Sequence, residues 1–225
     1  MSAPPFILVC FAVKEEAKSF SRLIASQPSV KILVTGMGRH NAESAIRAAL
    51  AEERPRIVLS AGFAGGLNPD IASGTVVFAT DKGTAMETKL LAAGALSARF
   101  HCASRIATTV KEKRALREAT GADAVEMESD AICAICREQK VPVAIVRVIL
   151  DAANEDLPFN FNLLMTPDQR LNKRKLVLAL LKSPGKSAAL LRLQRQSRAA
   201  GEKLAAVLAS AIDTLQEARD EMVQG

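Results

Sequence analysis

The chain has 225 residues, of which 49% are hydrophobic and 24% charged, and it carries a formal net charge of +6 at pH 7. This length suits one domain, because a single core serves roughly 200–250 residues before chains divide, and the hydrophobic fraction excludes a chain that is disordered throughout. The positive charge allows nucleic acid, anionic lipid or an anionic ligand as a partner, but the absence of Trp and Tyr disfavours a single-strand binder with an aromatic platform.

Short apolar segments alternate with helical patterns along the first 150 residues. We expect strands at Phe6–Val13, Val30–Thr35, Arg56–Ser60, Gly74–Ala79, Ala122–Glu126 and Val143–Leu150. We expect helices at Glu15–Ala25, Asn41–Glu53, Lys111–Ala119 and Ser129–Gln139. Near-continuous β-branched runs are typical of strands that helices cover on both faces. The pattern predicts the α/β class, as a three-layer α/β/α sandwich around a mixed, mainly parallel sheet.

The segment after Asp151 has a different character. Leu157–Leu171 predicts a loop that packs on the domain, and Lys173–Lys182 and Ser187–Glu217 predict two helices separated at Ser183-Pro184-Gly185. One face of the second helix is apolar, and it carries Leu204, Val207, Leu208, Ala211, Ile212 and Leu215. Most of the excess positive charge lies in this part of the chain. We expect a single domain over residues 1–225, in which residues 170–225 form a basic C-terminal helical extension.

Signals for secretion and disulfide bonding are missing from the sequence. The Phe6–Val13 segment lacks the basic flank and the small-residue cleavage site of a signal peptide. No apolar run approaches the roughly 18 residues of a membrane span. Four cysteines do not make a disulfide scaffold in a chain of this length, which indicates reduced thiols. We therefore expect a cytoplasmic protein.

Two glycine-rich segments follow predicted strands. Gly36-Met37-Gly38 comes after Val30–Thr35, and Ala61–Gly66 comes after Arg56–Ser60. Ligands of open α/β sheets bind beyond the carboxyl ends of the strands, and glycines there let backbone N–H groups approach a ligand closely. Glycines also form ordinary turns between a strand and a helix, so both interpretations stay open at this point.

Three acidic residues also fall at the ends of predicted strands. Glu126 and Glu128 are two residues apart, so on a strand they would point together toward a ligand or cation. At a helix N-terminus they would instead interact with the helix dipole. Asp151 directly follows Val143–Leu150, where partly apolar surroundings raise a carboxyl pKa into the range of a general acid. The alternative for Asp151 is the N-cap of a following turn.

No residue pattern predicts a metal or a cofactor. Cys133 and Cys136 form a C-x-x-C within a helical stretch, which favours buried small hydrophobic residues over a zinc or redox site. His40 and His101 are isolated, and Ser60 lacks the nucleophile-elbow context of a serine hydrolase. We expect no bound metal and no cofactor.

The chain resembles the nucleoside phosphorylase and nucleosidase superfamily in four segments, which occur in order and each at a predicted strand end. These are Thr35-Gly36-Met37-Gly38, Ser60–Leu67, Ala124–Ser129 and Val146–Asp151. They are most similar to methylthioadenosine/adenosylhomocysteine nucleosidases and their relatives, over residues 6 to 155. Asp151-Ala152-Ala153-Asn154 and Thr166-Pro167-Asp168 resemble the hopanoid-biosynthesis-associated branch, which is credited with removing adenine from adenosylhopane. The resemblance implies a nucleoside phosphorylase-like fold.

The resemblance also implies roles for individual residues. Asp151 would protonate the purine at N7 as the general acid, and Glu16, which aligns better than Glu15, would activate the attacking water. Glu128 would hold the ribose hydroxyls beside Glu126, whose role the resemblance does not define. The other substrate-binding residues would be Met37, Gly38, Ala64, Gly65, Ile106, Ala107 and Met127, with adenine held partly by the backbone near Ile106–Thr108.

The attacking nucleophile is either water or phosphate. Phosphorylases place an arginine and a serine around the second glycine-rich segment, where this chain has Ser60 and Phe63, so the strongest phosphate contact is missing. Arg39, beside the first glycine-rich segment, would be the phosphate ligand if there is one. Leu150 stands where family members carry a serine that orients the catalytic aspartate. We favour water.

We therefore predict hydrolysis of the N-glycosidic bond of an adenine nucleoside with an apolar 5′ group such as adenosylhopane. The alternatives are phosphorolysis to ribose 1-phosphate and a non-catalytic nucleoside-binding module. The tail residues Phe159, Phe161, Leu163, Leu164 and Met165 would form an apolar wall over the 5′ group, or simply pack on the sheet. We expect a small-molecule partner and no nucleic acid, and the family implies a homo-oligomer, with a dimer favoured. The basic tail would be a solvated face or a contact with anionic membrane.

Overall fold

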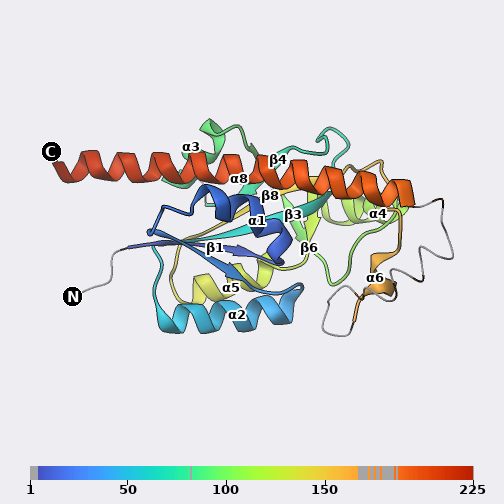
Figure 1. Ribbon diagram of the computed structural model, residues 1–225, viewed down its shortest axis with the longest axis horizontal. Helices are drawn as coiled ribbons and strands as arrows, with labels where there is room; N and C mark the ends of the chain where they lie inside the picture. The colour runs from blue at the N-terminus through green and yellow to red at the C-terminus, as the bar shows by residue number, and fades with distance from the viewer. Residues whose placement is uncertain are drawn as a thin grey trace.

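The computed structural model describes residues 5–81, 83–166 and 187–224, together with Asn172, Lys175, Leu178 and Gly185 (Figure 1). Its central sheet contains β1 (Ile7–Phe11), β2 (Val30–Val34), β3 (Ile57–Gly66), β4 (Val76–Ala79), β5 (Leu96–Ser97), β6 (Phe100–Cys102), β7 (Ala124–Glu126) and β8 (Val143–Asp151). The strand order is β2-β1-β3-β8-β4-β5, and β7 pairs with both β3 and β6. Only the β3–β7 and β4–β8 pairs in this description are antiparallel, which confirms the predicted mixed, mainly parallel sheet.

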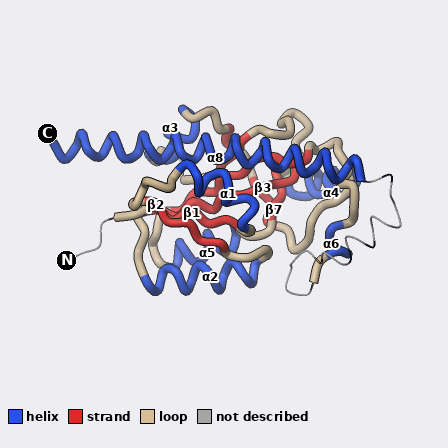
Figure 2. The backbone as a smooth tube through the Cα atoms, viewed as in Figure 1, coloured by secondary structure: helices blue, strands red, loops and turns tan. Residues whose placement is uncertain are grey.

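Helices cover both faces of the sheet (Figures 1 and 2). The helices α1 (Lys14–Leu23), α3 (Ala85–Ala92) and α8 (Ser187–Gln224) lie on one face, and α2 (Arg39–Glu52) and α5 (Ser129–Glu138) lie on the other. The helices α4 (Val110–Thr120) and α6 (Phe161–Leu164) lie together at one end of the molecule. The three-layer arrangement is the one that the sequence predicts.

The first strand shows why these apolar runs form central strands. Alternate side chains of a strand point to opposite faces. Val9 and Phe11 of β1 pack into the core under α1 and α8, whereas Leu8 and Cys10 pack into the core under α2 and α5. A strand between two helical layers has no polar face, so an unbroken hydrophobic run is stable there.

The basic C-terminal helix is also a large part of one core. On α8 the side chains of Leu204, Leu208, Ala211 and Ile212 are fully buried against α1, α3 and the sheet. The predicted apolar face therefore packs on the domain, except that the side chain of Leu215 lies outside the described ones. The arginines in the first half of the helix, among them Arg192, Arg195 and Arg198, are exposed.

Three features of the fold differ from the prediction. Ala61–Gly66, expected as a turn, continues strand β3, because its backbone pairs with β8 as far as Gly65 and with β7 at its end. The short elements α3, β5 and β6 lie where no element was predicted, and α6 lies inside the predicted loop Leu157–Leu171. The predicted helix Lys173–Lys182 falls almost wholly outside the described residues.

Candidate active site

A cavity of about 280 Å³ lies where β1, β3, β7 and β8 end. Nearly all of the predicted site residues line it: Glu16, Met37, Ala64, Gly65, Ile106, Ala107, Glu126, Met127, Glu128 and Asp151. They come from distant parts of the chain. The sheet brings them together because the parallel strands β1, β3 and β8 end at one edge and β7 pairs with the end of β3. Of the remaining two, Gly38 contributes a backbone donor to Glu128, and Arg39 is an exposed residue at the start of α2 that does not line the cavity.

Glu16 reaches the end of β3 from the first turns of α1. Its Oε1 accepts the backbone N–H of Phe63 at 3.0 Å, and its Oε2 accepts the N–H of Ala12 at 3.2 Å. A Cβ on Gly62 would lie 3.0 Å from Oε2, so only glycine leaves room for this carboxylate. Burial raises the pKa of Glu16 to about 7, against the opposing effects of Arg147 and the Phe63 hydrogen bond. A carboxyl with this pKa can act as a general base near neutral pH.

Glu126 and Glu128 have different partners, although the sequence predicts that they point together. Glu126 ends β7, and its carboxylate accepts the N–H groups of Glu128 and Ser129 at 3.0 and 2.9 Å and the Ser129 hydroxyl at 2.5 Å. It thus satisfies backbone donors at the start of α5, which is the helix-terminus interpretation of this motif. Glu128 is the N-cap residue of α5 rather than a strand residue, and it turns toward the first glycine-rich segment.

Glu128 accepts the N–H of Gly38 at 2.7 Å, so the first glycine-rich segment donates to a protein carboxylate. Gly38 has φ +82°, a conformation that favours glycine. Burial raises the pKa of Glu128 above its ordinary value, while Arg147 and the Gly38 hydrogen bond oppose the rise. A buried carboxylate on the cavity wall is suited to accept hydrogen bonds from ligand hydroxyl groups.

Arg147, in the middle of β8, is the buried cation among these carboxylates, and the sequence reasoning did not single it out. Its Nη2 donates to Glu126 at 2.8 Å and to the Ser60 hydroxyl at 3.1 Å. Burial opposes ionisation of Glu126, but Arg147 and the Ser129 hydrogen bonds outweigh that effect and hold its pKa below the usual range. The one signal in the sequence is a charged residue inside an otherwise apolar strand.

The guanidinium of Arg147 retains unused donors. Its Nε and Nη1 are buried and have no hydrogen-bond partner among the described residues. Such groups cost free energy unless a ligand or water pairs with them. The charges of Glu16 and Glu128 both act on Arg147, so the three side chains form one electrostatic cluster beside the cavity.

Asp151 lies at the end of β8 with only 6% of its surface exposed. Burial raises its pKa above the ordinary value, and the ammonium of Lys113 opposes this rise. Lys113, on α4, is a second residue that the sequence reasoning missed, and its Nζ lies 2.5 Å from Asp151 Oδ2. A buried, partly neutralised carboxyl at a cavity wall can serve as a general acid.

The backbone of Ile106 already has partners in this structure. Its N–H donates to Asn162 Oδ1 and its carbonyl accepts from Asn162 Nδ2, both at 2.9 Å. A primary amide presents one acceptor and one donor side by side, as the N1 and N6 edge of adenine does. An adenine bound to Ile106 would therefore replace the Asn162 side chain.

The outer wall of the cavity is apolar. Leu157, Phe161 from α6 and Leu193 from α8 line it, together with Phe63. The other four expected wall residues are not among the lining residues: Phe159 and Leu164 are buried, Leu163 is 70% exposed and Met165 is half-buried. The one cation among the lining residues, Arg105, forms an ion pair with Glu112 at 2.9 Å.

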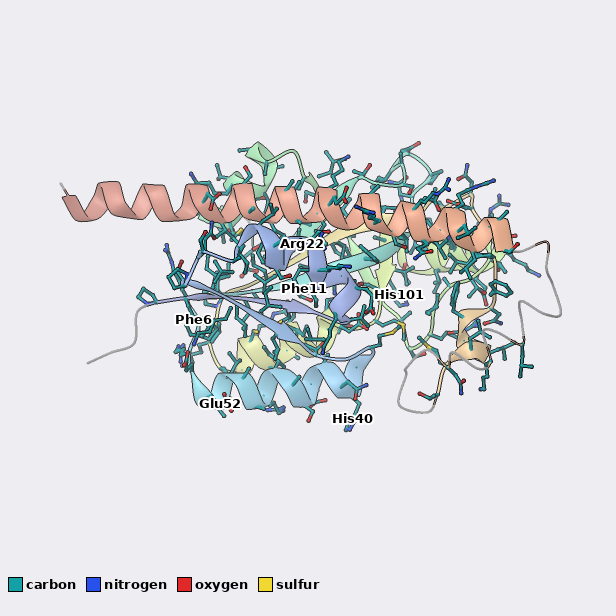
Figure 3. The ribbon with its side chains drawn as sticks, in the orientation of Figure 1. Phe6, Phe11, Arg22, His40, Glu52 and His101 are labelled. Atoms are coloured by element: carbon teal, nitrogen blue, oxygen red, sulfur yellow. The ribbon has the colours of Figure 1, made fainter. Side chains whose placement is uncertain are left out.

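The described residues contain no group of three or more His, Cys, Asp or Glu side chains arranged to hold a metal. The two histidines lie apart, His40 on α2 and His101 on β6 (Figure 3). Cys133 and Cys136 are free thiols buried on α5. Within the same described part of the chain, no helix has the length and apolar character that crossing a bilayer requires.

Comparison with known proteins identifies a family and a fold. The sequence profile of the phosphorylase superfamily matches residues 10–90 and 95–182. Futalosine hydrolase of Helicobacter pylori superposes with a TM-score of 0.71 at 13% identity, over 93% of this chain and 98% of that one. The 5′-methylthioadenosine/S-adenosylhomocysteine nucleosidase of Campylobacter jejuni superposes with a TM-score of 0.69 at 14% identity, over 94% and 100%.

The corresponding nucleosidase of Neisseria meningitidis, in complex with methylthio-immucillin-A, gives a TM-score of 0.69 at 16% identity, again over 94% and 100%. At these identities the likeness concerns the fold. No curated protein sequence matches the chain significantly.

Proposed function

The chain belongs to the phosphorylase superfamily, and from this premise we propose that it hydrolyses the N-glycosidic bond of a purine nucleoside and releases the free base. The main support is the hydrogen bond from Phe63 N–H to Glu16, a carboxyl group that lines the same cavity as Asp151. A carboxyl with a pKa of about 7 and a second, buried carboxyl with a raised pKa are the two groups that acid–base hydrolysis requires.

In the proposed reaction Glu16 accepts one proton and Asp151 donates one. Glu16 takes a proton from a water molecule as the water oxygen bonds to C1′ of the ribose. The bond from C1′ to N9 breaks, and its electron pair moves into the purine ring. Asp151 gives its proton to N7, so the base leaves as a neutral molecule. Positive charge on the ribosyl ring in the transition state is stabilised by the surrounding carboxylates.

Glu128 and Arg147 support this assignment. Glu128, fixed by the Gly38 N–H, is placed to accept hydrogen bonds from ribose hydroxyls. Arg147 does not line the cavity, but its charge acts on Glu16 and lowers the pKa of that carboxyl against the effect of burial. A lower pKa keeps more of Glu16 in the deprotonated form, which is the form that accepts a proton from water.

The same contacts favour water over phosphate as the nucleophile. A phosphate needs backbone N–H donors and cations. Here the N–H groups of Gly38 and Phe63 donate to Glu128 and Glu16. Arg39 does not line the cavity, so the one phosphate ligand that the sequence offers is absent from its wall. A phosphate dianion in this cavity would face several carboxylates.

We also propose that the base is adenine and that the 5′ group is apolar, as in adenosylhopane. The support is the wall formed by Leu157, Phe161 and Leu193, which carries no charged group. Burying a single aliphatic or aromatic side chain is worth roughly 1.5–3 kcal/mol, and an alkyl substituent against this wall would gain a comparable amount.

A contact with anionic membrane follows from the same wall, and we propose it as the route of delivery for an apolar substrate. Leu163 and Leu191 are exposed two positions along the chain from the lining residues Phe161 and Leu193, and Arg192 is exposed as well. Exposed leucines and a cation suit a surface of anionic lipid. Co-sedimentation with phosphatidylglycerol vesicles but not with phosphatidylcholine vesicles is the expected result.

Self-association, which the family resemblance implies, is tested by light scattering of the purified protein.

The activity is tested by chromatography of the products from five nucleosides: adenosine, inosine, methylthioadenosine, adenosylhomocysteine and an alkyl-extended adenosine. Each is incubated with the protein in the presence and absence of phosphate. We expect release of adenine and a free reducing ribose at the same rate in both conditions. Ribose 1-phosphate as the product would show a phosphorylase, and tight binding without cleavage would show a binding module.

A further inference from the structure

We propose that Lys113 is a positioning residue for Asp151: it fixes the orientation of the carboxyl group and strengthens it as an acid. The inference rests on the proposed function, because Asp151 is the general acid there. Lys113 does not line the cavity, so any effect on the reaction passes through Asp151.

The first observation is the place of Lys113 in the fold. Its side chain is fully buried, and it lies in the first turn of α4, directly after the capping box formed by Thr109 and Glu112. Both features are unfavourable for a cation, because burial removes its hydration and the N-terminus of a helix carries partial positive charge. A lysine in such a place requires strong compensating contacts.

The compensating contacts all lie at the end of β8. The Nζ atom of Lys113 donates to the carbonyl of Ala152 at 2.6 Å and to the carbonyl of Glu155 at 2.7 Å, and it lies 2.5 Å from Asp151 Oδ2. The two carbonyl oxygens accept hydrogen bonds, and the contact with Asp151 Oδ2 is an ion pair without hydrogen-bond geometry. Lys113 therefore connects α4 to the turn that follows β8.

Other contacts hold the same two segments together. The N–H of Val110 donates to Asp156 Oδ1 at 2.6 Å, and the N–H of Leu157 donates to the carbonyl of Thr108 at 2.9 Å. The start of α4 is thus a rigid support against which the turn after Asp151 is fixed.

The consequence for the acid is geometric and electrostatic. The ion pair of Lys113 with Oδ2 limits the orientations that the Asp151 carboxyl group can adopt. The charged groups that act on Asp151 are Lys113 on α4 and Glu155 in the following turn, and the uncharged Gly65 of β3 lies close to its carboxyl group. When Asp151 gives up its proton, a bare buried carboxylate would be costly, and the neighbouring ammonium stabilises it.

The experiment compares Lys113→Met, Lys113→Gln and Lys113→Arg with the wild type. Lys111→Met removes an exposed lysine from the same helix and serves as the matched control. Folding of each variant is checked by circular dichroism and thermal unfolding. The Asp151 carboxyl is titrated by ¹³C NMR in aspartate-labelled protein, with Asp151→Asn used to assign the signal. The kcat and KM for methylthioadenosine, or for the best nucleoside of the product screen, are measured across pH.

In the Met and Gln variants we expect the pKa of Asp151 to rise and kcat to fall about tenfold or more, with KM changed little. The alkaline limb of the kcat profile, which reports loss of the acid proton, should move to higher pH. Arg should restore both quantities in part, and Lys111→Met should alter neither. An unchanged titration of the Asp151 carboxyl in a folded Met or Gln variant overturns the inference. If neither of these variants folds, the Arg variant decides. The inference is then overturned by an Arg variant in which the Asp151 titration is that of the wild type and kcat is less than a tenth of the wild-type value.

The NMR titration needs no substrate, so it separates the two proposals. A wild-type protein that cleaves no nucleoside contradicts the proposed function. The change in the Asp151 titration caused by Lys113→Met tests the role of Lys113 whether or not the protein cleaves a nucleoside.

Discussion

Glu16 Oε1 accepts the backbone N–H of Phe63 at 3.0 Å, so a carboxyl group from α1 lies at the glycine-containing end of β3. In an anion-binding site this N–H would face the ligand. Here it holds a protein side chain whose pKa is raised to about 7 by burial. The contact makes this end of the sheet suited to water activation, and it gives the site a pH dependence that can be measured.

Replacing Glu16 by Gln should remove the general base. We expect kcat to fall about 100-fold or more, because positioned acid–base groups contribute roughly 10²–10⁴-fold. In the wild type the base must be deprotonated, so kcat should rise with pH through about 7 and the variant should lose this limb. The measurement is a pH series of initial rates, and a variant with an unchanged acidic limb would contradict the assignment.

Glu16 should also make folding stability pH-dependent. Its folded pKa lies above the ordinary value of 4.5, so its protonated form is the favoured one in the folded protein. The stabilising contribution is complete below about pH 4.5 and is lost as pH rises through about 7. Urea unfolding at pH 6 and pH 8 should show that wild type loses more stability over this interval than Glu16→Gln. An equal loss in both proteins would place the titration elsewhere.

Part of the fold and of the site could be predicted from the sequence, and the failures have physical causes. The Val143–Leu150 run forms a central strand as expected, because a continuous β-branched sequence is stable in a strand that helices cover on both faces. The Ala61–Gly66 segment was misjudged, since the local preference of glycine for turns is overridden by pairing with β8. Lys113 and Arg147 were missed because their partners, Asp151 and Glu126, are distant in sequence and a single chain carries no sign of such pairs.

Substituting Gly62 by Ala tests the close approach of Glu16. The added Cβ would lie 3.0–3.2 Å from the carboxyl atoms of Glu16, so the side chain must move and its hydrogen bond to Phe63 must lengthen. We expect a large loss of kcat. Gly74→Ala is the matched control, because Gly74 has φ +80° and nothing within 4 Å of its Cβ position. The control should cost about 1 kcal/mol of stability from backbone strain and leave kcat unchanged. Equal kcat losses in both variants would point to a general folding effect.

The Arg147–Glu126 pair should be costly to break and cheaper to replace. Arg147→Met leaves the buried Glu126 carboxylate without its cation, which costs about 3–5 kcal/mol. The double variant Arg147→Met/Glu126→Gln should recover much of that loss, because the remaining amide is neutral. Stability is measured by urea unfolding, and additive losses in the double variant would show that the pair is not coupled. Activity should not return with stability, because Arg147 no longer opposes the effect of burial on the pKa of Glu16.

Phe161 should determine selectivity for the 5′ group. Its ring lines the outer cavity wall, whereas Leu163 on the same short helix is 70% exposed and does not line the cavity. In Phe161→Ala the ratio of kcat/KM for an alkyl-extended adenosine to kcat/KM for adenosine should fall about 10-fold or more, because an aromatic contact is worth roughly 1.5–3 kcal/mol. Leu163→Ala, the matched control, should leave the ratio unchanged. Parallel losses for both nucleosides in Phe161→Ala would mean that the ring supports the base or ribose, and the apolar wall would then have no part in recognising the 5′ group.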